Sequence, residues 1–178
     1  MPRPRVSALL AAAAGLVLLA GLAGCSPDTG DHRGYAVPGE LCDVPVPVSV
    51  IEPLLPDGER LTTRSGGTDG LRTCTLTVDG DLAVSAKTER WEHGTSVRKV
   101  MSATPGLGDA AAPARAGQAV ATSSAGLRRV DCGSAPGDRE EVFATVRAEN
   151  APGESALRKA VTAYARGAAD AAGTCGRG

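Results

Sequence analysis

The sequence predicts an α+β fold class: an antiparallel β-sheet flanked by helices, including a C-terminal helix, and held by two disulfides. Three observations carry this prediction. Threonine-rich strand patterns follow one another between residues 59 and 92, an amphipathic helical pattern closes the chain, and four cysteines are spread between residues 42 and 175. Successive strands with separate helices are typical of the α+β class.

The first 24 residues have the pattern of a signal peptide. Arg3 and Arg5 give a positive start, and from Val6 to Ala23 the single polar residue is Ser7. A positive region followed by an apolar run is the layout of a secretory signal. An uncleaved membrane anchor is the competing interpretation, but the run falls slightly short of the ~20 residues that cross a bilayer.

The four residues Leu22 to Cys25, LAGC, resemble the bacterial lipobox, in which one hydrophobic and two small residues precede a cysteine. The resemblance implies that diacylglycerol, with acyl chains such as palmitate, is attached to the Cys25 thiol and that the signal is cut before this residue. Two acyl chains anchor a protein stably, since each buried CH₂ contributes ~0.8 kcal/mol. We therefore predict lipidation at Cys25 and a lipid-anchored location on the extracytoplasmic face of the cell membrane. A cysteine that lies by chance near an ordinary cleavage site is the alternative.

The composition limits the size and the charge of the chain that follows the signal peptide. Removal of residues 1–24 from the 178-residue chain leaves 154 residues, enough for one domain with a real core. All 20 acidic residues and 17 of the 19 basic ones remain, so the formal charge is −3. A weakly acidic chain offers no electrostatic footprint for nucleic acid. It also has no strong attraction to an anionic membrane, so we expect attachment through the lipid.

The expected organisation has three parts. Residues 1–24 are the cleaved signal peptide, residues 25–39 a flexible tether, and residues 40–178 a single extracytoplasmic α+β domain. The tether is expected because "SPDTGDHRGYAVPG" is polar and interrupted by Gly and Pro.

The domain is expected to open with a short helix and three strands. Ser49 followed three residues later by Glu52 suggests a capping box, and Pro53 keeps that helix short. The strand candidates are "ERLTTRS", "LRTCTLTV" and "LAVSAKTERW", at residues 59–65, 71–78 and 82–91.

Two registers compete for the hairpin at Asp79-Gly80. A two-residue turn would set Val78 opposite Asp81 and Leu76 opposite Ala83, whereas a three-residue loop with a bulge would set Leu76 opposite Leu82. The second register pairs apolar with apolar, and we expect it.

The remaining elements are read from periodicity. Thr95 or Ser96 is expected to cap a helix that carries Val97, Val100 and Met101 on one face. Strands are expected at "QAVATS", "LRRVDC" and "EEVFATVRAE". Residues 154–173 form the best helical pattern, with Gly173 as its stop and an apolar face of Leu157, Val161, Tyr164, Ala165 and Ala168.

Four cysteines remain once Cys25 is assigned to lipid. An exported domain lies in an oxidising compartment, so Cys42, Cys74, Cys132 and Cys175 are expected to form two disulfides. We favour the pairs Cys42–Cys74 and Cys132–Cys175, and the two crossed pairings remain open. Zinc binding is disfavoured because the chain lacks a CxxC pair and has two histidines.

Searches for catalytic motifs find little. The chain contains no GxSxG, P-loop, GxGxxG or HExxH pattern, and we expect no cofactor and no metal site. In "ERWEH", Glu89 to His93, Glu89 stands where an inverted zincin motif needs His, so a solvated strand end is the preferred interpretation. A histidine-dependent mechanism would use His93, with Ser96, Ser102 or Ser123 as partner.

The chain after the signal resembles a large group of small actinobacterial lipoproteins of unknown function. The shared features are the lipobox, the tether, a cysteine before a short helix, "LCDVPVPVSVIEPLLP", a second in "LRTCTLTV", the Gly-Leu-Gly-Asp-Ala turn at 106–110, and the C-terminal helix. These patterns are also similar to envelope lipoproteins and sensor modules of the Mog1/PsbP-like kind. The resemblance implies an antiparallel sheet flanked by helices and no catalytic residues.

The sequence therefore predicts a lipid-anchored envelope protein that is not an enzyme and binds a small ligand or a protein partner. The alternative is a cell-wall hydrolase or transferase, which requires a polar cleft that gathers His93 with a carboxylate or a hydroxyl.

Overall fold

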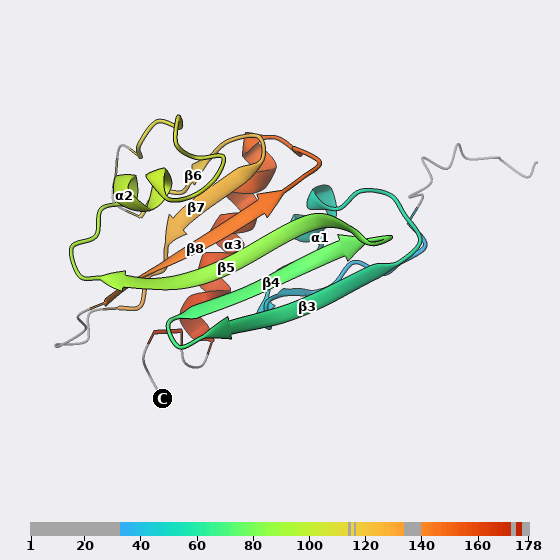
Figure 1. The fold of residues 1–178 in the computed structure, drawn as a ribbon, viewed down its shortest axis with the longest axis horizontal. Helices are drawn as coiled ribbons and strands as arrows, with labels where there is room; N and C mark the ends of the chain where they lie inside the picture. Colours follow the sequence, from blue (N-terminus) through green and yellow to red (C-terminus); the bar gives the residue numbers. More distant parts are fainter. Residues whose placement is uncertain (1–32, 114, 116, 134–139, 172–173, 176–178) are drawn as a thin grey trace, which may run out of the picture. The chain divides into compact units, whose positions relative to one another are not determined.

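The computed structural model describes residues 33–113, 115, 117–133, 140–171 and 174–175. Within them a six-stranded antiparallel sheet has the order β3-β4-β5-β8-β7-β6 (Figure 1), and β1 and β2 form a separate pair. The predicted fold class is confirmed. The strands are β1 Glu40–Leu41, β2 Val44–Pro45, β3 Leu61–Thr68, β4 Leu71–Val78, β5 Asp81–Glu92, β6 Val120–Ala121, β7 Ala125–Arg129 and β8 Glu140–Ala148. The helices are α1 Val48–Ile51, the 3₁₀ turn Glu52–Leu54, α2 Val97–Ser102 and α3 Glu154–Asp170.

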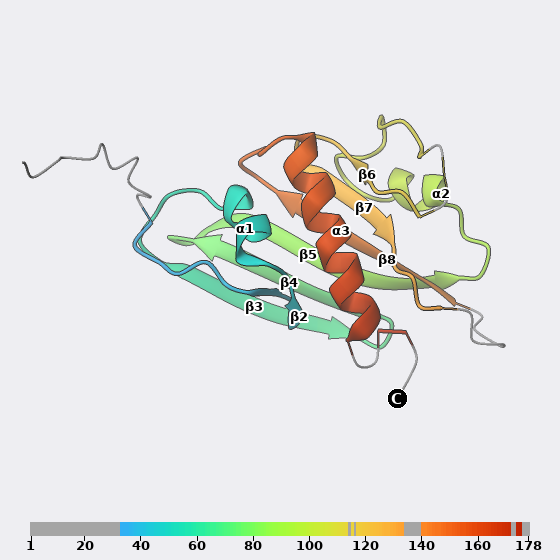
Figure 2. The ribbon, with the colours of Figure 1, turned by 180° about the vertical axis from the view of Figure 1, so that it is seen from behind.

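Helix α3 covers one face of the sheet, which we call the inner face (Figure 2). The predicted apolar face is confirmed, because Leu157, Val161, Tyr164, Ala165 and Ala168 are all buried. The helix ends at Asp170 with Ala171 as its C-cap, and Gly173, the expected stop, lies outside the described residues. None of the helices in the described ranges combines the length and apolar character needed to cross a membrane.

Two glycines let α3 approach its neighbours closely. A Cβ on Gly126 of β7 would lie 2.9 Å from the carbonyl oxygen of Leu157, and one on Gly167 of α3 would lie 2.6 Å from the carbonyl oxygen of Pro45. Both obstacles are backbone atoms, which cannot rotate away. The helix therefore packs against β7 on one side and β2 on the other only because these side chains are missing.

The hairpin between β4 and β5 differs from the expected register. Asp79 and Gly80 form a two-residue turn, both with positive φ, and Val78 pairs with Asp81. A register shift between Leu76 and Thr77 then sets Leu76 opposite Val84 rather than Leu82. The expected three-residue loop is wrong because the bulge lies inside the ladder and not at the turn. The bulge sets Leu76 opposite another apolar residue, which a two-residue turn without a bulge would not do.

A second core cluster lies on the opposite, outer face of the sheet, at its β7–β8 end. Val100, Met101 and Leu107, from α2 and the loop after it, are buried together with Leu127 and Phe143. As predicted, Ser96 caps α2, and its hydroxyl accepts a hydrogen bond from the Lys99 N–H at 3.2 Å.

The capping box expected at Ser49 and Glu52 is wrong. Helix α1 begins at Val48 with Pro47 at its N-cap, and no side chain caps it. The helix thus begins two residues earlier than the Ser49 signal suggests, directly after Pro47, whose backbone is extended.

Both favoured disulfides are present, which excludes the crossed pairings. Cys42 is bonded to Cys74 and Cys132 to Cys175, with Cα–Cα distances of 5.0 and 5.4 Å. The first bond is buried and holds the N-terminal segment against β4. The second is partly exposed and joins the segment after β7 to the segment after α3.

Substitution of Gly167 by Val is expected to lower the free energy of unfolding by about 2 kcal/mol, because the side chain meets the backbone of Pro45. Gly108→Val is the matched control: nothing lies within 4 Å of its Cβ position, and it should change stability by no more than about 0.5 kcal/mol. Urea unfolding of both variants provides the measurement. Equal stability of the two variants would contradict the proposed close packing.

The two disulfides should differ in their rate of reduction. Cys132 and Cys175 are partly exposed, whereas Cys42 and Cys74 are 1% and 2% exposed, so dithiothreitol should reduce the Cys132–Cys175 bond first. Alkylation at timed intervals followed by peptide mass spectrometry would measure the order. In 8 M urea, roughly the concentration that unfolds small domains, the difference should vanish.

The two bonds close loops of 32 and 43 residues, so the loss of either should lower the free energy of unfolding by about 3–4 kcal/mol.

Candidate functional site

Cys25 and the signal segment lie outside the described residues, so lipidation at Cys25 remains a prediction. The second half of the expected tether, however, is described. Residues 33–35 are fastened to the segment 52–58, and the chain from Arg33 onward belongs to the folded domain.

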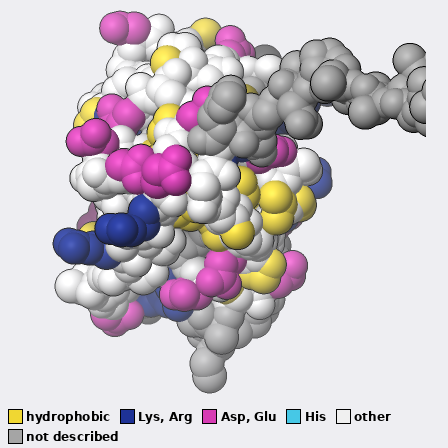
Figure 3. Space-filling view, turned by 90° about the vertical axis from the view of Figure 1, so that its right-hand side faces the viewer, with side chains coloured by type: hydrophobic (Ala, Val, Ile, Leu, Met, Phe, Trp, Pro, Cys, Tyr) yellow, Lys and Arg dark blue, Asp and Glu magenta, His cyan; other side chains and the backbone are white. Residues whose placement is uncertain are grey.

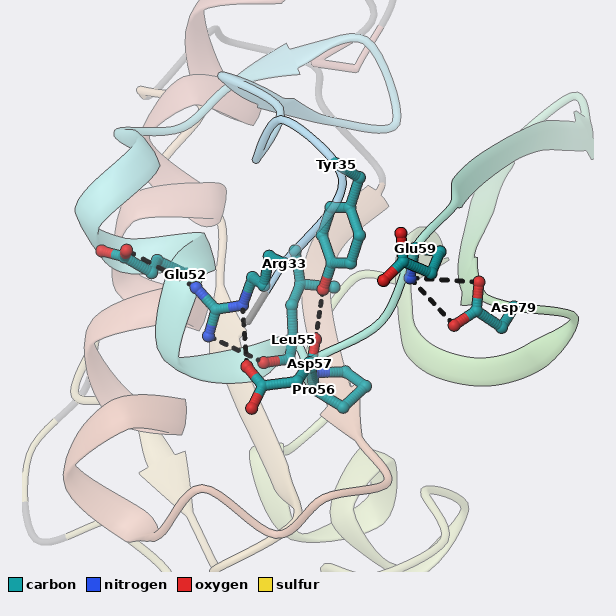
Figure 4. A network of polar contacts seen from close by, with 8 residues as sticks. All are labelled: Arg33, Tyr35, Glu52, Leu55, Pro56, Asp57, Glu59 and Asp79. Carbon is teal, nitrogen blue, oxygen red and sulfur yellow. Dashed lines mark hydrogen bonds and ion pairs between the residues drawn. The ribbon is translucent and has the colours of Figure 1, made fainter. Parts of the chain in front are cut away.

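The attachment of this segment is polar (Figure 4). The Arg33 guanidinium, 13% exposed, donates to the carbonyl oxygen of Leu55 at 3.1 Å and lies 3.5 and 3.9 Å from the carboxylates of Glu52 and Asp57. The Tyr35 hydroxyl donates to the carbonyl oxygen of Pro56, and the Gly34 N–H donates to the carbonyl oxygen of Gly58. We call this set of contacts the Arg33 clasp.

His93 is exposed in the turn after β5 and makes no hydrogen bond or ion pair with any described residue. Ser96 is used as the cap of α2, and the Ser102 hydroxyl donates to the carbonyl oxygen of Lys99. In "ERWEH", Glu89 pairs with Lys87 at 2.7 Å and Glu92 is exposed. The described part of the chain has no group of three or more His, Cys, Asp or Glu side chains arranged to hold a metal.

The outer face of β3, β4 and β5 is polar and has no helix over it (Figure 1). Cys74, Leu76 and Val78 of β4 are buried on the inner face, so the alternate residues point outward. The register then assigns the outward positions of β3. The outward side chains of these two strands are Thr62, Arg64, Thr68, Leu71, Thr73, Thr75 and Thr77.

A shallow hollow of about 520 Å³ lies on this face beside the Asp79–Gly80 turn. Arg60 and Arg64 line it, and neither guanidinium has a partner among the described residues. The hydroxyl side chains of Thr62, Thr75 and Thr77 line it as well. Together they form a polar surface that can donate hydrogen bonds and carries two unpaired positive charges.

The carboxylate of Asp79 lies at the edge of the same hollow but is already engaged. It accepts hydrogen bonds from the backbone N–H of Glu59 (Figure 4) and from that of Arg60, at 2.9–3.3 Å. Glu59 also lines the hollow, and its carboxylate lies toward Gly34. Neither acidic group therefore forms an ion pair with the two arginines.

The free edge of β3 adjoins this hollow. The Asp79 N–H donates to the carbonyl oxygen of Arg60, which makes Arg60 a position whose peptide groups face β4. Because these positions alternate along an antiparallel ladder, the N–H and C=O groups of Leu61, Thr63, Ser65 and Gly67 point away from the sheet. No described residue bonds to them. We call the hollow and this edge together the β3 site.

Two other hollows differ from the β3 site because an arginine that lines each of them is paired with a carboxylate. In one of about 290 Å³ near the β3–β4 turn, Arg90 lies 3.3 Å from Asp69 and 3.8 Å from Glu140. In one of about 450 Å³ beside β6, Arg158 contacts Glu154 and the carbonyl oxygen of Ala119. Of these three hollows, the one beside β3 is the one lined by arginines that form no ion pair with a described residue.

The exposed surface offers little to an apolar ligand. Among the described residues the large hydrophobic side chains that are exposed are Val48 and Leu82, at 46% and 42%. Figure 3 looks onto the end of the domain that carries α1 and the β4–β5 turn, where apolar side chains lie among acidic and basic ones. The surface chemistry therefore favours a polar ligand.

The β3 site was not singled out in the sequence, although a signal was present. "LTTRSGGT" has one apolar residue, so neither face of that strand is apolar. A strand that is polar on both faces is typical of a sheet edge.

Comparison with known proteins does not identify the chain. No family model matches it, and neither a curated protein nor a solved structure shows significant similarity. The function of the chain is therefore inferred from its own residues.

One buried titratable group lies under α3. Tyr164 is fully buried, and its hydroxyl has no hydrogen-bond partner in the described structure. Burial raises the pKa of its phenol well above the usual value near 10, and the charge of Arg72 opposes this only in part.

Tyr164→Phe is therefore expected to stabilise the domain by about 1 kcal/mol at neutral pH, because it removes a buried hydroxyl that bonds to nothing. The folded state keeps the phenol proton that the unfolded chain releases near pH 10, so the wild type loses stability as pH rises above 10. The variant should lack that contribution.

Tyr35→Phe is the control: it loses a hydrogen bond to Pro56 and should lower the free energy of unfolding by about 1 kcal/mol. Unfolding at pH 7 to 11, roughly spanning the ordinary tyrosine pKa, measures both effects. Destabilisation of the Tyr164 variant at neutral pH would contradict the absence of a partner.

Proposed function

We propose that this chain is a lipid-anchored protein of the cell envelope that works as a non-catalytic binding module, with the β3 site as its binding surface. The observation that carries the binding role is the unpaired polar chemistry of that site. Two exposed arginines without partners and four outward peptide positions without hydrogen bonds lie side by side.

Unpaired groups of this kind favour association. A free strand edge is a template for pairing with another chain, and folded proteins usually block it. A guanidinium without a counterion is similarly available to a carboxylate or phosphate, which it binds through two parallel hydrogen bonds. Both groups are hydrated in the free protein, so the site is suited to a polar partner rather than an apolar one.

The anchoring part of the proposal rests on the residues Leu22 to Cys25 and on the apolar run before them. The Arg33 clasp adds a geometric consequence. From Cys25 to Arg33 the chain has eight residue steps, which reach at most about 28 Å when fully extended. A lipid on Cys25 would thus hold the folded domain close to the membrane surface.

The anchoring part is tested by mass spectrometry and phase partitioning of the native protein. The expected N-terminus is an acylated Cys25, and the protein should enter the detergent phase. Cys25→Ala should remove the acyl mass and move the protein to the aqueous phase. A conservative control, Ser26→Ala, should behave as the wild type. An unmodified thiol at Cys25 in a protein released from membranes would overturn the proposed anchor.

A further inference from the structure

Strand β3 lacks most of the features with which folded proteins protect a sheet edge, although it carries one charged side chain, Arg64. It contains neither proline nor lysine, and its pairing with β4 is regular from Leu61 to Thr68, without a bulge. All of its residues from Thr62 to Thr68 are exposed. An edge of this length, open and regular, can accept another extended strand.

The positive charges beside the edge are the second feature. Arg60 and Arg64 are exposed and unpaired, whereas Lys87, on the same face of β5, is paired with Glu89. Arg147 of β8 similarly lies 3.5 Å from Glu149. Lys87 and Arg147, which also point to the outer face, thus have carboxylate partners that Arg60 and Arg64 lack.

We propose that the β3 site binds an extended acidic peptide segment of a partner protein, which adds to the sheet as a strand beside β3. This inference rests on the proposed function as a binding module and names its class of partner. The peptide N–H and C=O groups of Leu61, Thr63, Ser65 and Gly67 supply the backbone hydrogen bonds. Arg60 and Arg64 supply the selectivity for acidic side chains.

The spacing of the site fits such a segment. Side chains at alternate positions of an added strand lie on the outer face, about 7 Å apart, next to Thr62, Arg64 and Gly66. Gly66 has no side chain, and nothing but the Thr73 hydroxyl lies within 4 Å of its Cβ position. A glutamate across from Gly66 therefore has room to turn toward Arg64, and the eight residues of β3 accommodate a segment of similar length.

A second copy of the chain is a poorer occupant of the same edge. When two copies of β3 overlap fully in antiparallel orientation, their Arg64 side chains come within one or two positions of each other. Like charges that face each other across a ladder destabilise the pair. Acidic side chains of a partner would attract Arg64, whereas the Arg64 of a second copy would repel it.

The test uses the ¹⁵N-labelled mature chain in a non-ionic detergent and three additions. The first is an eight-residue peptide with Glu at alternate positions and Thr or Val between them. The second is the same peptide with Gln in place of Glu. The third is a solubilised envelope extract. We expect the Glu peptide to slow amide exchange at Leu61, Thr63, Ser65 and Gly67, and to bind more weakly as salt rises.

The Gln peptide should bind about tenfold more weakly, since it lacks two charge pairs that are each worth up to fivefold. Arg64→Gln and Arg60→Gln should each weaken binding of the Glu peptide about threefold. Arg98→Gln is the matched control, an exposed arginine of α2 far from the site in sequence, and should change nothing. Ser65→Pro blocks the edge without removing a bond to β4, because its N–H points outward, so it should abolish binding while the fold persists.

The outcomes separate the partner class from the proposed function. Equal binding of the Glu and Gln peptides, or binding of the Glu peptide without protection of the edge amides, overturns the acidic strand. If neither peptide binds while the extract shifts the signals of the β3 site, the partner class is wrong and the binding module stands. If the extract also leaves these signals unchanged, the proposed binding function fails. Concentration-dependent protection of the edge without any addition would assign it to a second copy.

Discussion

The structure depends on how one helix covers one face of a six-stranded sheet. Helix α3 has 17 residues and packs mainly on β7 and β8, with Gly126 and Gly167 giving it room. The sheet is wider than a helix, whose diameter is about 10–12 Å with side chains. The inner face of β4 therefore needs another cover, and the segment that carries Cys42, bonded to Cys74, provides it. At the far edge β3 is left exposed.

The same constraint explains the polarity of the outer face. The loop that contains α2 covers that face only at its β7–β8 end, where the second cluster around Phe143 forms. Nothing described covers the outer face of β3, β4 and β5. An apolar face there would be an exposed patch, so the threonines of β4 replace it: they keep the strand propensity of a β-branched residue and present a hydroxyl to water.

Local chemistry made much of this fold predictable. The face of α3 follows from helical periodicity, the Ser96 cap from a side chain that acts within three residues, and the even cysteine set from the exclusion of Cys25. The wrong predictions involve contacts that are remote in sequence. The bulge at Leu76 and Thr77 serves the packing of the whole inner face. The sequence placed Arg33 and Tyr35 in a flexible tether because their hydrogen-bond partners, Leu55 and Pro56, lie more than 20 residues away along the chain.

The β3 site was only half predictable for a similar reason. The polar composition of "LTTRSGGT" indicates an edge strand, but the lack of partners for Arg60 and Arg64 is known only once the positions of all neighbouring carboxylates are known. Asp79 illustrates this, since it adjoins Arg60 and yet accepts backbone N–H groups.

The proposed lipid anchor and the proposed binding mode support each other physically. Strand addition at a polar edge gains little from apolar burial, so its intrinsic affinity is low. Arginine–carboxylate pairs at an exposed site add about 1 kcal/mol or less each. A partner held at the same membrane meets the β3 site at a high effective concentration, as in a short flexible linkage. The Arg33 clasp shortens the connection from Cys25, which strengthens this effect, because a domain confined near the surface samples a smaller volume.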